Sequence, residues 1–182
     1  MNSISDDFQI YKYKIPNWQE KKYKLIELFY KTKPRIYGNV LTNFNSGEQN
    51  RFFLNSEIQK ILINDIEKFL TDIKDIDDND YCLNSSWMQI YEKNMSHEIH
   101  DHGLGYSAII YLKFDRKIHS STVFVDKKTI NDSKKLFEPE INEGDIIFFN
   151  SKHYHYCPTN DNDKERMICS FNLKKDFKIS YS

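Results

Sequence analysis

Three histidines have the residue type and the spacing of a metal site. His100 and His102 lie two residues apart, and His155 follows later in the chain. Side chains two apart on a β-strand point to the same face, so the first pair can converge on one ion. Neutral imidazole binds iron, zinc, copper and nickel. Three protein ligands leave coordination positions open, whereas a structural zinc site is closed by four. The pattern predicts a catalytic metal centre.

The remaining candidates around this motif are weaker. His153 would share the face of the third histidine on a regular strand, and it stays open as a fourth ligand, a group near the metal or an exposed residue. His97 stands at odd spacing from His100, so a regular strand would turn it away. Asp101 alternates to the opposite face, and we expect it to be exposed or to lie beside the ligands. His119 lies in a charged stretch and is expected at the surface. The competing interpretation is that all these residues are polar groups on solvated strands.

A later strand-like segment has the residues of an anion site. Arg166, Ile168, Ser170 and Asn172 alternate along it and share one face. The guanidinium offers paired donors and the serine hydroxyl adds another, so this face can bind a carboxylate. The alternative is an arginine on an edge strand in a surface salt bridge. The position of Arg166, shortly after a predicted metal ligand, favours the anion site.

Three aromatic residues lie near these motifs. Tyr91 and Tyr111 combine an aromatic body with a polar tip, so each is either a contact in the site or a core residue with a satisfied hydroxyl. Trp87 is expected to serve core packing rather than substrate contact.

The elements that must position these residues read as two helices followed by strands. Apolar residues at helical spacing predict helices over 18–31 and 56–73, with Ser56 as the N-cap of the second and 75–80 as a polar connector. Short segments rich in aromatic and β-branched residues then predict strands. These are 86–92, 98–102, 106–114, 121–125, 145–150, 153–158 and 166–173. The pattern indicates a sandwich, jelly roll or barrel.

Length and composition limit the functional class. The 182 residues suit one domain, in which 1–80 form a helical part packed on the outside of a β core at 81–175. With 26 basic and 27 acidic residues, the net charge of −1 argues against nucleic acid as a partner. Three irregularly spaced cysteines do not form a disulfide framework, and the polar N-terminus does not resemble a signal peptide. No apolar run is long enough to span a bilayer. We therefore expect a cytoplasmic protein.

Several motifs, taken in order, resemble the non-haem Fe(II)- and 2-oxoglutarate-dependent oxygenases, particularly their prolyl-4-hydroxylase-like members from phages and marine bacteria. The resemblance covers residues 87–172 and rests on Trp-Met-Gln-Ile-Tyr at 87–91, His-Asp-His-Gly at 100–103, Ser-Ala-Ile-Ile-Tyr-Leu at 107–112, Gly-Asp-Ile-Ile-Phe-Phe-Asn-Ser at 144–151, and the strand 166–172. Asn150 replaces a usual proline and Ile168 a usual serine. His102 stands where most such oxygenases have a carboxylate.

The resemblance implies a fold and a ligand set. The fold would be mostly β, a double-stranded β-helix (a cupin-like jelly-roll barrel) with N-terminal helices. Fe(II) would be held by His100, His102 and His155. Arg166 would bind the distal carboxylate of 2-oxoglutarate, helped by Ser170 or Tyr111, with Tyr91 and Asn172 close by. Dioxygen would be the second cosubstrate. The products would be succinate, CO₂ and a hydroxylated substrate, with no separate acid–base pair.

Two other function classes stay open. A cupin-type metal enzyme without 2-oxoglutarate fits the two histidines, although it needs no Arg166 and usually has a glutamate that is missing here. A non-catalytic jelly roll that binds a sugar, peptide or partner is the third class. The prime substrate, a small molecule or a peptide, and the oligomeric state are not specified by the sequence. The 126–142 loop is either a lid over the site or a surface excursion.

Overall fold

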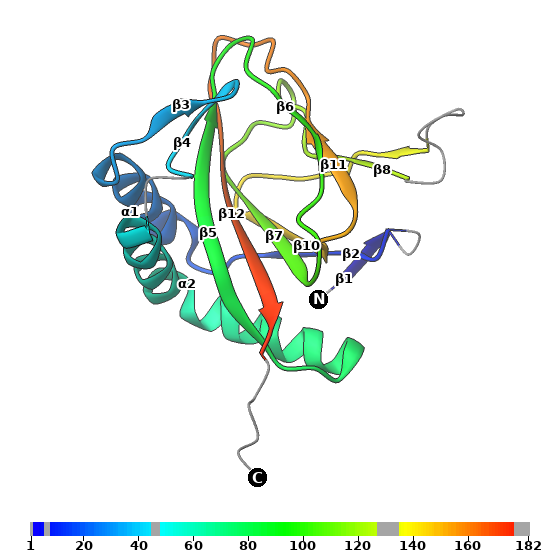
Figure 1. The fold of residues 1–182 in the computed structure, drawn as a ribbon. Helices are drawn as coiled ribbons and strands as arrows, with labels where there is room; N and C mark the ends of the chain where they lie inside the picture. Colours follow the sequence, from blue (N-terminus) through cyan, green and yellow to red (C-terminus); the bar gives the residue numbers. More distant parts are fainter. Residues whose placement is uncertain (1, 6–7, 45–47, 127–134, 177–182) are drawn as a thin grey trace.

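Two antiparallel β-sheets build the fold, and two helices cover the outer side of the larger one (Figure 1). The computed structural model describes residues 2–5, 8–44, 48–126 and 135–176. The large sheet has the strand order β1-β2-β10-β7-β12-β5-β4-β3, and the small sheet has the order β6-β11-β8-β9. The fold is a mostly-β double-stranded β-helix, or jelly roll, as the sequence predicts.

The predicted strands of the β core are present, with shifted ends. β5 starts earlier than expected, β8 is shorter and β12 runs further. The bounds are β5 Tyr81–Tyr91, β6 His97–His100, β7 Tyr106–Lys113, β8 Val123–Val125, β9 Leu136–Phe137, β10 Asp145–Asn150, β11 Tyr154–Cys157 and β12 Arg166–Lys175. β12 pairs with β5 on one side and with β7 on the other. The strand that begins with Arg166 is therefore central in its sheet, and the edge-strand alternative was wrong.

The first 80 residues contain strands as well as helices. β1 Asn2–Ser5 and β2 Ile10–Lys14 extend the large sheet through the pairing of β2 with β10. β3 Arg35–Tyr37 and β4 Val40–Thr42 extend it at the opposite edge, beside β5. The prediction of a purely helical N-terminal part was therefore incomplete. These strands are too short to show a clear alternation in the sequence.

The two helices confirm the helical periodicity and correct one boundary. α1 Trp18–Lys31 has the predicted limits. α2 Glu48–Asp77 begins before the predicted start, and its backbone departs from helical geometry at Leu62 (φ −113°, ψ 19°). Ser56 therefore lies inside the helix, and its assignment as an N-cap was wrong. The predicted polar connector does end α2, within about a turn.

Two apolar cores lie on opposite faces of the large sheet. The outer core packs helix residues such as Phe29, Ile58 and Phe69 against Phe148 and Phe171 of the sheet. The inner core lies between the two sheets and includes residues from β5, β7, β8, β10, β11 and β12. The outer core fixes the large sheet, and the inner core leaves one end of the space between the sheets to polar residues.

Two sequence expectations concern segments outside the cores. Neither described helix combines the length and the apolar character that a bilayer span needs. The predicted 126–142 loop contains β9, which pairs with β8. Its residues 127–134, on which the lid hypothesis depends, lie outside the described residues.

Candidate metal and cosubstrate site

Three imidazoles meet at the β6–β11 end of the small sheet. His100 is the last residue of β6, and its register partner on β11 is His155. His102 lies in the turn that follows β6. The ligating nitrogens of the three side chains all lie within 4.8 Å of one another. The structure thus brings together the three histidines that the spacing selected.

Local backbone contacts fix which ring nitrogen of two of these histidines is free. Nδ1 of His100 lies 2.7 Å from the carbonyl oxygen of Glu98, and Nδ1 of His155 lies 2.9 Å from that of His153. A carbonyl oxygen only accepts, so each Nδ1 must carry the proton and donate it. In the neutral ring Nε2 then keeps its lone pair, which is the state of a metal ligand whose orientation is set by a hydrogen bond.

Burial keeps the imidazoles of His102 and His155 neutral. It lowers the pKa of His102 to about 4, with the neighbouring His100 adding to the effect. Burial and the same neighbour also lower the pKa of His155 well below its usual value. Metal ions bind imidazole only in its deprotonated form, so at neutral pH these rings need lose no proton to act as ligands.

A β-bulge turns a fourth imidazole toward the site. In the pairing of β6 with β11, His100 is opposite His155 but His97 is opposite Cys157, so β6 has one extra residue between the two pairs. The extra residue breaks the regular alternation of side chains. The ring of His97 stacks on that of His100 with centroids 4.3 Å apart and lines the pocket. The prediction that His97 would point away was wrong, because it assumed a regular strand.

Two other candidates lie outside the histidine group. Asp101 is exposed, and its Oδ1 accepts a hydrogen bond from the backbone N–H of Gly103 at 2.9 Å. His153 precedes the first residue of β11, so strand alternation does not apply to it. Its ring lies 5.8 Å from that of Phe8. Neither side chain belongs to the group of converging ligands.

A pocket opens beside the three histidines and is lined by uncharged or weakly basic side chains. Its empty volume is about 350 Å³, including the part open to solvent. Trp87 lines it, and its ring centroid lies 5.5 Å from that of His102. Trp87 was expected only to pack in the core. Gln89, Thr122 and Tyr156 also line the pocket and were not singled out from the sequence.

Arg166 does not line the pocket itself but is buried against Tyr91, which does. The side chain is 1% exposed. One Nη donates to the carbonyl oxygen of Ser120 and the other to that of Pro158, at 2.8 Å in the second case. The guanidinium carbon lies 4.6 Å from the ring centre of Tyr91. Nε is buried and has no hydrogen-bond partner among the described residues. A buried, unpartnered N–H of a cation is costly unless an acceptor completes it.

The other predicted cosubstrate residues surround the same space. Tyr91, Ser170 and Asn172 line the pocket. The Oδ1 of Asn172 accepts a hydrogen bond from Ser107 at 2.8 Å. Tyr111 does not line the pocket. Its hydroxyl lies 3.1 Å from Oγ1 of Thr122 and accepts the backbone N–H of that residue at 3.2 Å, so it borders the site through a lining residue.

Comparison with known proteins agrees with this geometry. The profile of the family described as "Putative 2OG-Fe(II) oxygenase" matches residues 85–172, the segment that contains all three histidines and Arg166. The chain belongs to the 2OG-Fe(II) oxygenase superfamily. It is a 2-oxoglutarate-dependent dioxygenase by class, and Fe(II) and 2-oxoglutarate are its metal and cosubstrate. A search of curated protein sequences finds no match.

Solved structures of oxygenases share the fold at low sequence identity. HygX from Streptomyces hygroscopicus, with nickel and 2-oxoglutarate bound, is 10% identical with a TM-score of 0.70, over 94% of this chain and 85% of that one. The viral collagen prolyl hydroxylase from Paramecium Bursaria Chlorella virus-1 is 17% identical with a TM-score of 0.58, over 92% and 97%. SnoK, a carbocyclase from nogalamycin biosynthesis, is 13% identical with a TM-score of 0.61, over 95% and 84%.

The residues of this oxygenase fit both Fe(II) and 2-oxoglutarate. Three convergent imidazoles, two of them with Nδ1 hydrogen-bonded to a backbone carbonyl, suit a divalent transition metal. The unpartnered Nε of Arg166 suits a carboxylate oxygen. Each Nη already donates one hydrogen bond to a backbone carbonyl, so part of the donor set expected from the sequence is engaged in fixing the guanidinium.

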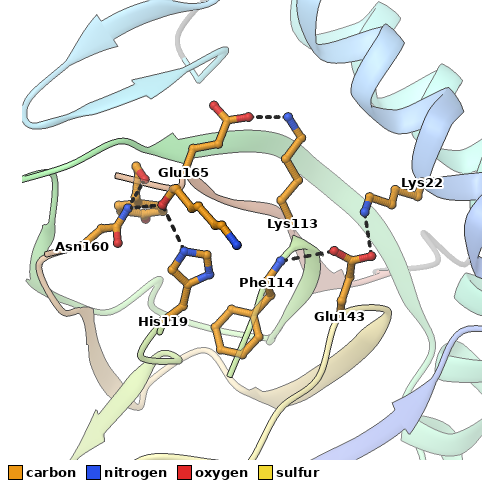
Figure 2. A network of polar contacts seen from close by, with 9 residues as sticks. Lys22, Lys113, Phe114, His119, Glu143, Asn160 and Glu165 are labelled. Atoms are coloured by element: carbon orange, nitrogen blue, oxygen red, sulfur yellow. Dashed lines mark hydrogen bonds and ion pairs between the residues drawn. The ribbon is translucent and has the colours of Figure 1, made fainter. Parts of the chain in front are cut away.

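His119 corrects a further expectation. It was predicted at the surface, but it is 8% exposed. Nδ1 accepts the backbone N–H of Asp115 at 3.0 Å, and Nε2 lies 3.1 Å from the carbonyl oxygen of Lys164 (Figure 2). The charges around it in the sequence face outward, whereas the ring turns inward to backbone groups. Sequence patterning does not report such contacts, since their partners are main-chain atoms common to all residues.

Proposed function

We propose that this oxygenase hydroxylates a C–H bond of a neutral small-molecule or peptide segment. Iron, 2-oxoglutarate and dioxygen supply the oxidising chemistry, in which one oxygen atom enters the substrate and the other enters succinate as CO₂ is released. The observations that support the proposal are three convergent imidazoles that line one pocket and a buried arginine with an unpartnered N–H, which packs on Tyr91, a residue of the same lining.

We assign His100, His102 and His155 as the metal ligands. The carbonyl oxygens of Glu98 and His153 orient two of the rings. The turn that carries His102 is held by its own backbone N–H, which donates to the carbonyl oxygen of Ser151 at 2.9 Å. These residues hold three positions around the metal and leave the others for the cosubstrate and dioxygen.

We assign Arg166 as the residue that binds the distal carboxylate of 2-oxoglutarate. Its Nε–H is available, and Ser170 adds a hydroxyl on the same face of β12. The ring of Tyr91 packs against the guanidinium. Tyr111 contributes a hydroxyl group and Asn172 an amide group to the polar surroundings. Burial strengthens the ion pair because the surroundings are of low dielectric.

The lining of the pocket supports a neutral substrate segment. Among the described residues, the lining side chains include no carboxylate or ammonium group, and the guanidinium of Arg166 lies against Tyr91 outside the lining. Two aromatic side chains connect the surface with the site. Phe44 is 43% exposed, and its ring centroid lies 5.3 Å from that of Trp87, whose ring in turn lies beside that of His102. We propose that the substrate approaches over these two aromatic rings, which bind apolar groups without a charged partner.

Succinate release from purified protein tests the proposal. The protein is incubated with Fe(II), ascorbate and 2-oxoglutarate in air, and succinate is measured against the same protein with Zn(II) in place of Fe(II). We expect succinate that depends on iron, even without substrate. The same measurement on Arg166→Ala protein separates this function from that of a cupin-type enzyme, which has no need of the arginine. Wild-type protein that binds iron but has no measurable affinity for 2-oxoglutarate would contradict the proposal.

A further inference from the structure

The side chain of Arg166 is fixed by two loops that contribute nothing else to the pocket. The 114–122 loop provides one acceptor at Ser120, and the 158–165 loop provides the other at Pro158. Both acceptors are main-chain carbonyls, so their positions depend on how the loops are held. Whatever holds the loops therefore sets where the free Nε–H of Arg166 lies.

Asn160 holds the 158–165 loop. It is 3% exposed and uses both ends of its amide. Nδ2 donates to the carbonyl oxygens of Tyr91 and Lys164, each at 2.9 Å, and Oδ1 accepts from the backbone of Asn162 at 3.2 Å. Tyr91 is the residue whose ring supports the guanidinium of Arg166. Asn160 thus ties the loop to the strand residue beneath the arginine.

His119 ties the two loops to each other. Since its Nδ1 accepts the backbone N–H of Asp115, the proton of the neutral ring is on Nε2, which donates to the carbonyl oxygen of Lys164. Figure 2 shows the ring of His119 and the amide of Asn160 reaching this same oxygen. His119 is the residue before Ser120, and Lys164 is two residues before Arg166. One shared carbonyl therefore links the segments that carry both Arg166 contacts.

We propose that His119 and Asn160 are positioning residues for 2-oxoglutarate, acting through Arg166. They hold the two loops so that both Nη groups stay bonded to the backbone and Nε–H stays free for the carboxylate. Neither side chain lines the pocket or belongs to the metal group. The inference rests on the proposed role of Arg166.

The first test measures the affinity for 2-oxoglutarate. Calorimetry on Fe(II)-loaded protein under argon compares wild type with His119→Phe, His119→Gln and Asn160→Ala. We expect the dissociation constant to rise about 10-fold in His119→Phe and Asn160→Ala, as when residues that orient a ligand are removed. His119→Gln retains an N–H donor and should restore most of the affinity. Iron affinity should stay within about 2-fold of wild type in each variant.

Lys113→Met is the matched control. It removes the half-exposed ion pair between Lys113 and Glu165, which lies in the same loop next to Arg166 but does not touch the carbonyls that hold the guanidinium (Figure 2). The affinity for 2-oxoglutarate should stay within about 2-fold of wild type, because partly exposed ion pairs contribute little. A loss in Lys113→Met equal to that in His119→Phe would show that any disturbance of this loop suffices, and would overturn the specific roles.

A double-mutant comparison decides whether the effect passes through Arg166. In an Arg166→Ala background, His119→Phe should add less than about 2-fold, since coupled residues are not additive. A full 10-fold further loss would overturn the proposal.

The single variants distinguish failure of the positioning roles from failure of the proposed function. If wild type binds 2-oxoglutarate and Arg166→Ala does not, but His119→Phe and Asn160→Ala bind as wild type does, then the positioning roles fail and the proposed function stands. If wild type itself does not bind, the proposed function fails.

A readout without iron or cosubstrate guards against a general loss of structure. In protein labelled with ¹⁵N-arginine, the Nε–H resonance of Arg166 is identified by its absence in Arg166→Lys protein. Because the group is buried, we expect it to exchange slowly with solvent in wild type and in Lys113→Met. Exchange should be at least about 10-fold faster in His119→Phe and Asn160→Ala. Unchanged exchange in both would contradict the proposal even if affinity fell.

Discussion

The two ends of the site are built in different ways. At the metal end, two of the three imidazoles are oriented by the carbonyl two residues earlier in the chain, so the anchor and the ligand are local neighbours. At the arginine end, one guanidinium contact spans 46 residues and the other 8, and both reach into loops. The metal end therefore depends mainly on short segments of β6 and β11. The arginine end depends on how distant loops meet.

The largest expected effect concerns the metal end. His155→Ala should reduce iron binding and succinate release more than about 100-fold, because it removes a ligand that the fold cannot replace. His153→Ala is the matched control, since its ring lies against Phe8 rather than among the ligands. Calorimetry with Fe(II) under argon should find the control within about 2-fold of wild type. Equal losses in both variants would show that the distinction between the two histidines is wrong.

The next effect concerns the arginine end. Arg166→Ala should raise the KM for 2-oxoglutarate about 100-fold, the contribution of a buried charge-assisted hydrogen bond. Arg166→Lys keeps the charge but not the guanidinium donors, and should recover only part of the loss. Iron affinity should change little in either variant. Should iron affinity fall as much as that for 2-oxoglutarate, the two ends would not be separable.

Two glycines that follow His102 should differ in how much they contribute to the free energy of unfolding. Gly105 has φ +109°, and a Cβ there would lie 2.1 Å from the carbonyl oxygen of Leu173. Gly105→Ala should lower the free energy of unfolding by about 3 kcal/mol. Gly103 has φ +75° with no atom within 4 Å of a Cβ, so Gly103→Ala should cost about 1 kcal/mol. Urea titration of both variants checks the difference, and equal costs would refute the close approach at Gly105.

The smallest effect concerns the carboxylate between the two histidines. Asp101→Asn keeps an oxygen that can accept the backbone N–H of Gly103, and Asp101 lies outside the ligand group. Iron affinity should therefore stay within about 2-fold of wild type, as for other exposed substitutions. A loss of ten-fold or more would mean that Asp101 is a ligand, and would bring the metal end closer to the usual site with one carboxylate.

The sequence predicted the local parts of the site better than the tertiary parts. The strands, α1 and the convergence of three histidines followed from alternation and helical periodicity. The inward turn of His97 was missed because a β-bulge has no clear signature in one sequence. His119 and Asn160 were missed because their partners are main-chain atoms, and those of Lys164 and Tyr91 lie far away in the chain from His119 and Asn160, respectively. Trp87 lines the pocket because the tertiary fold places its ring 5.5 Å from that of His102, which strand spacing does not specify.

Anomalous diffraction tests the central claim most directly. Crystals grown with Fe(II) and 2-oxoglutarate under argon would be measured on both sides of the iron absorption edge. We predict one strong peak bounded by Nε2 of His100, His102 and His155, with density for a dicarboxylate that runs from the metal to Nε of Arg166. An iron peak elsewhere, or a carboxylate that does not contact Arg166, would contradict the account.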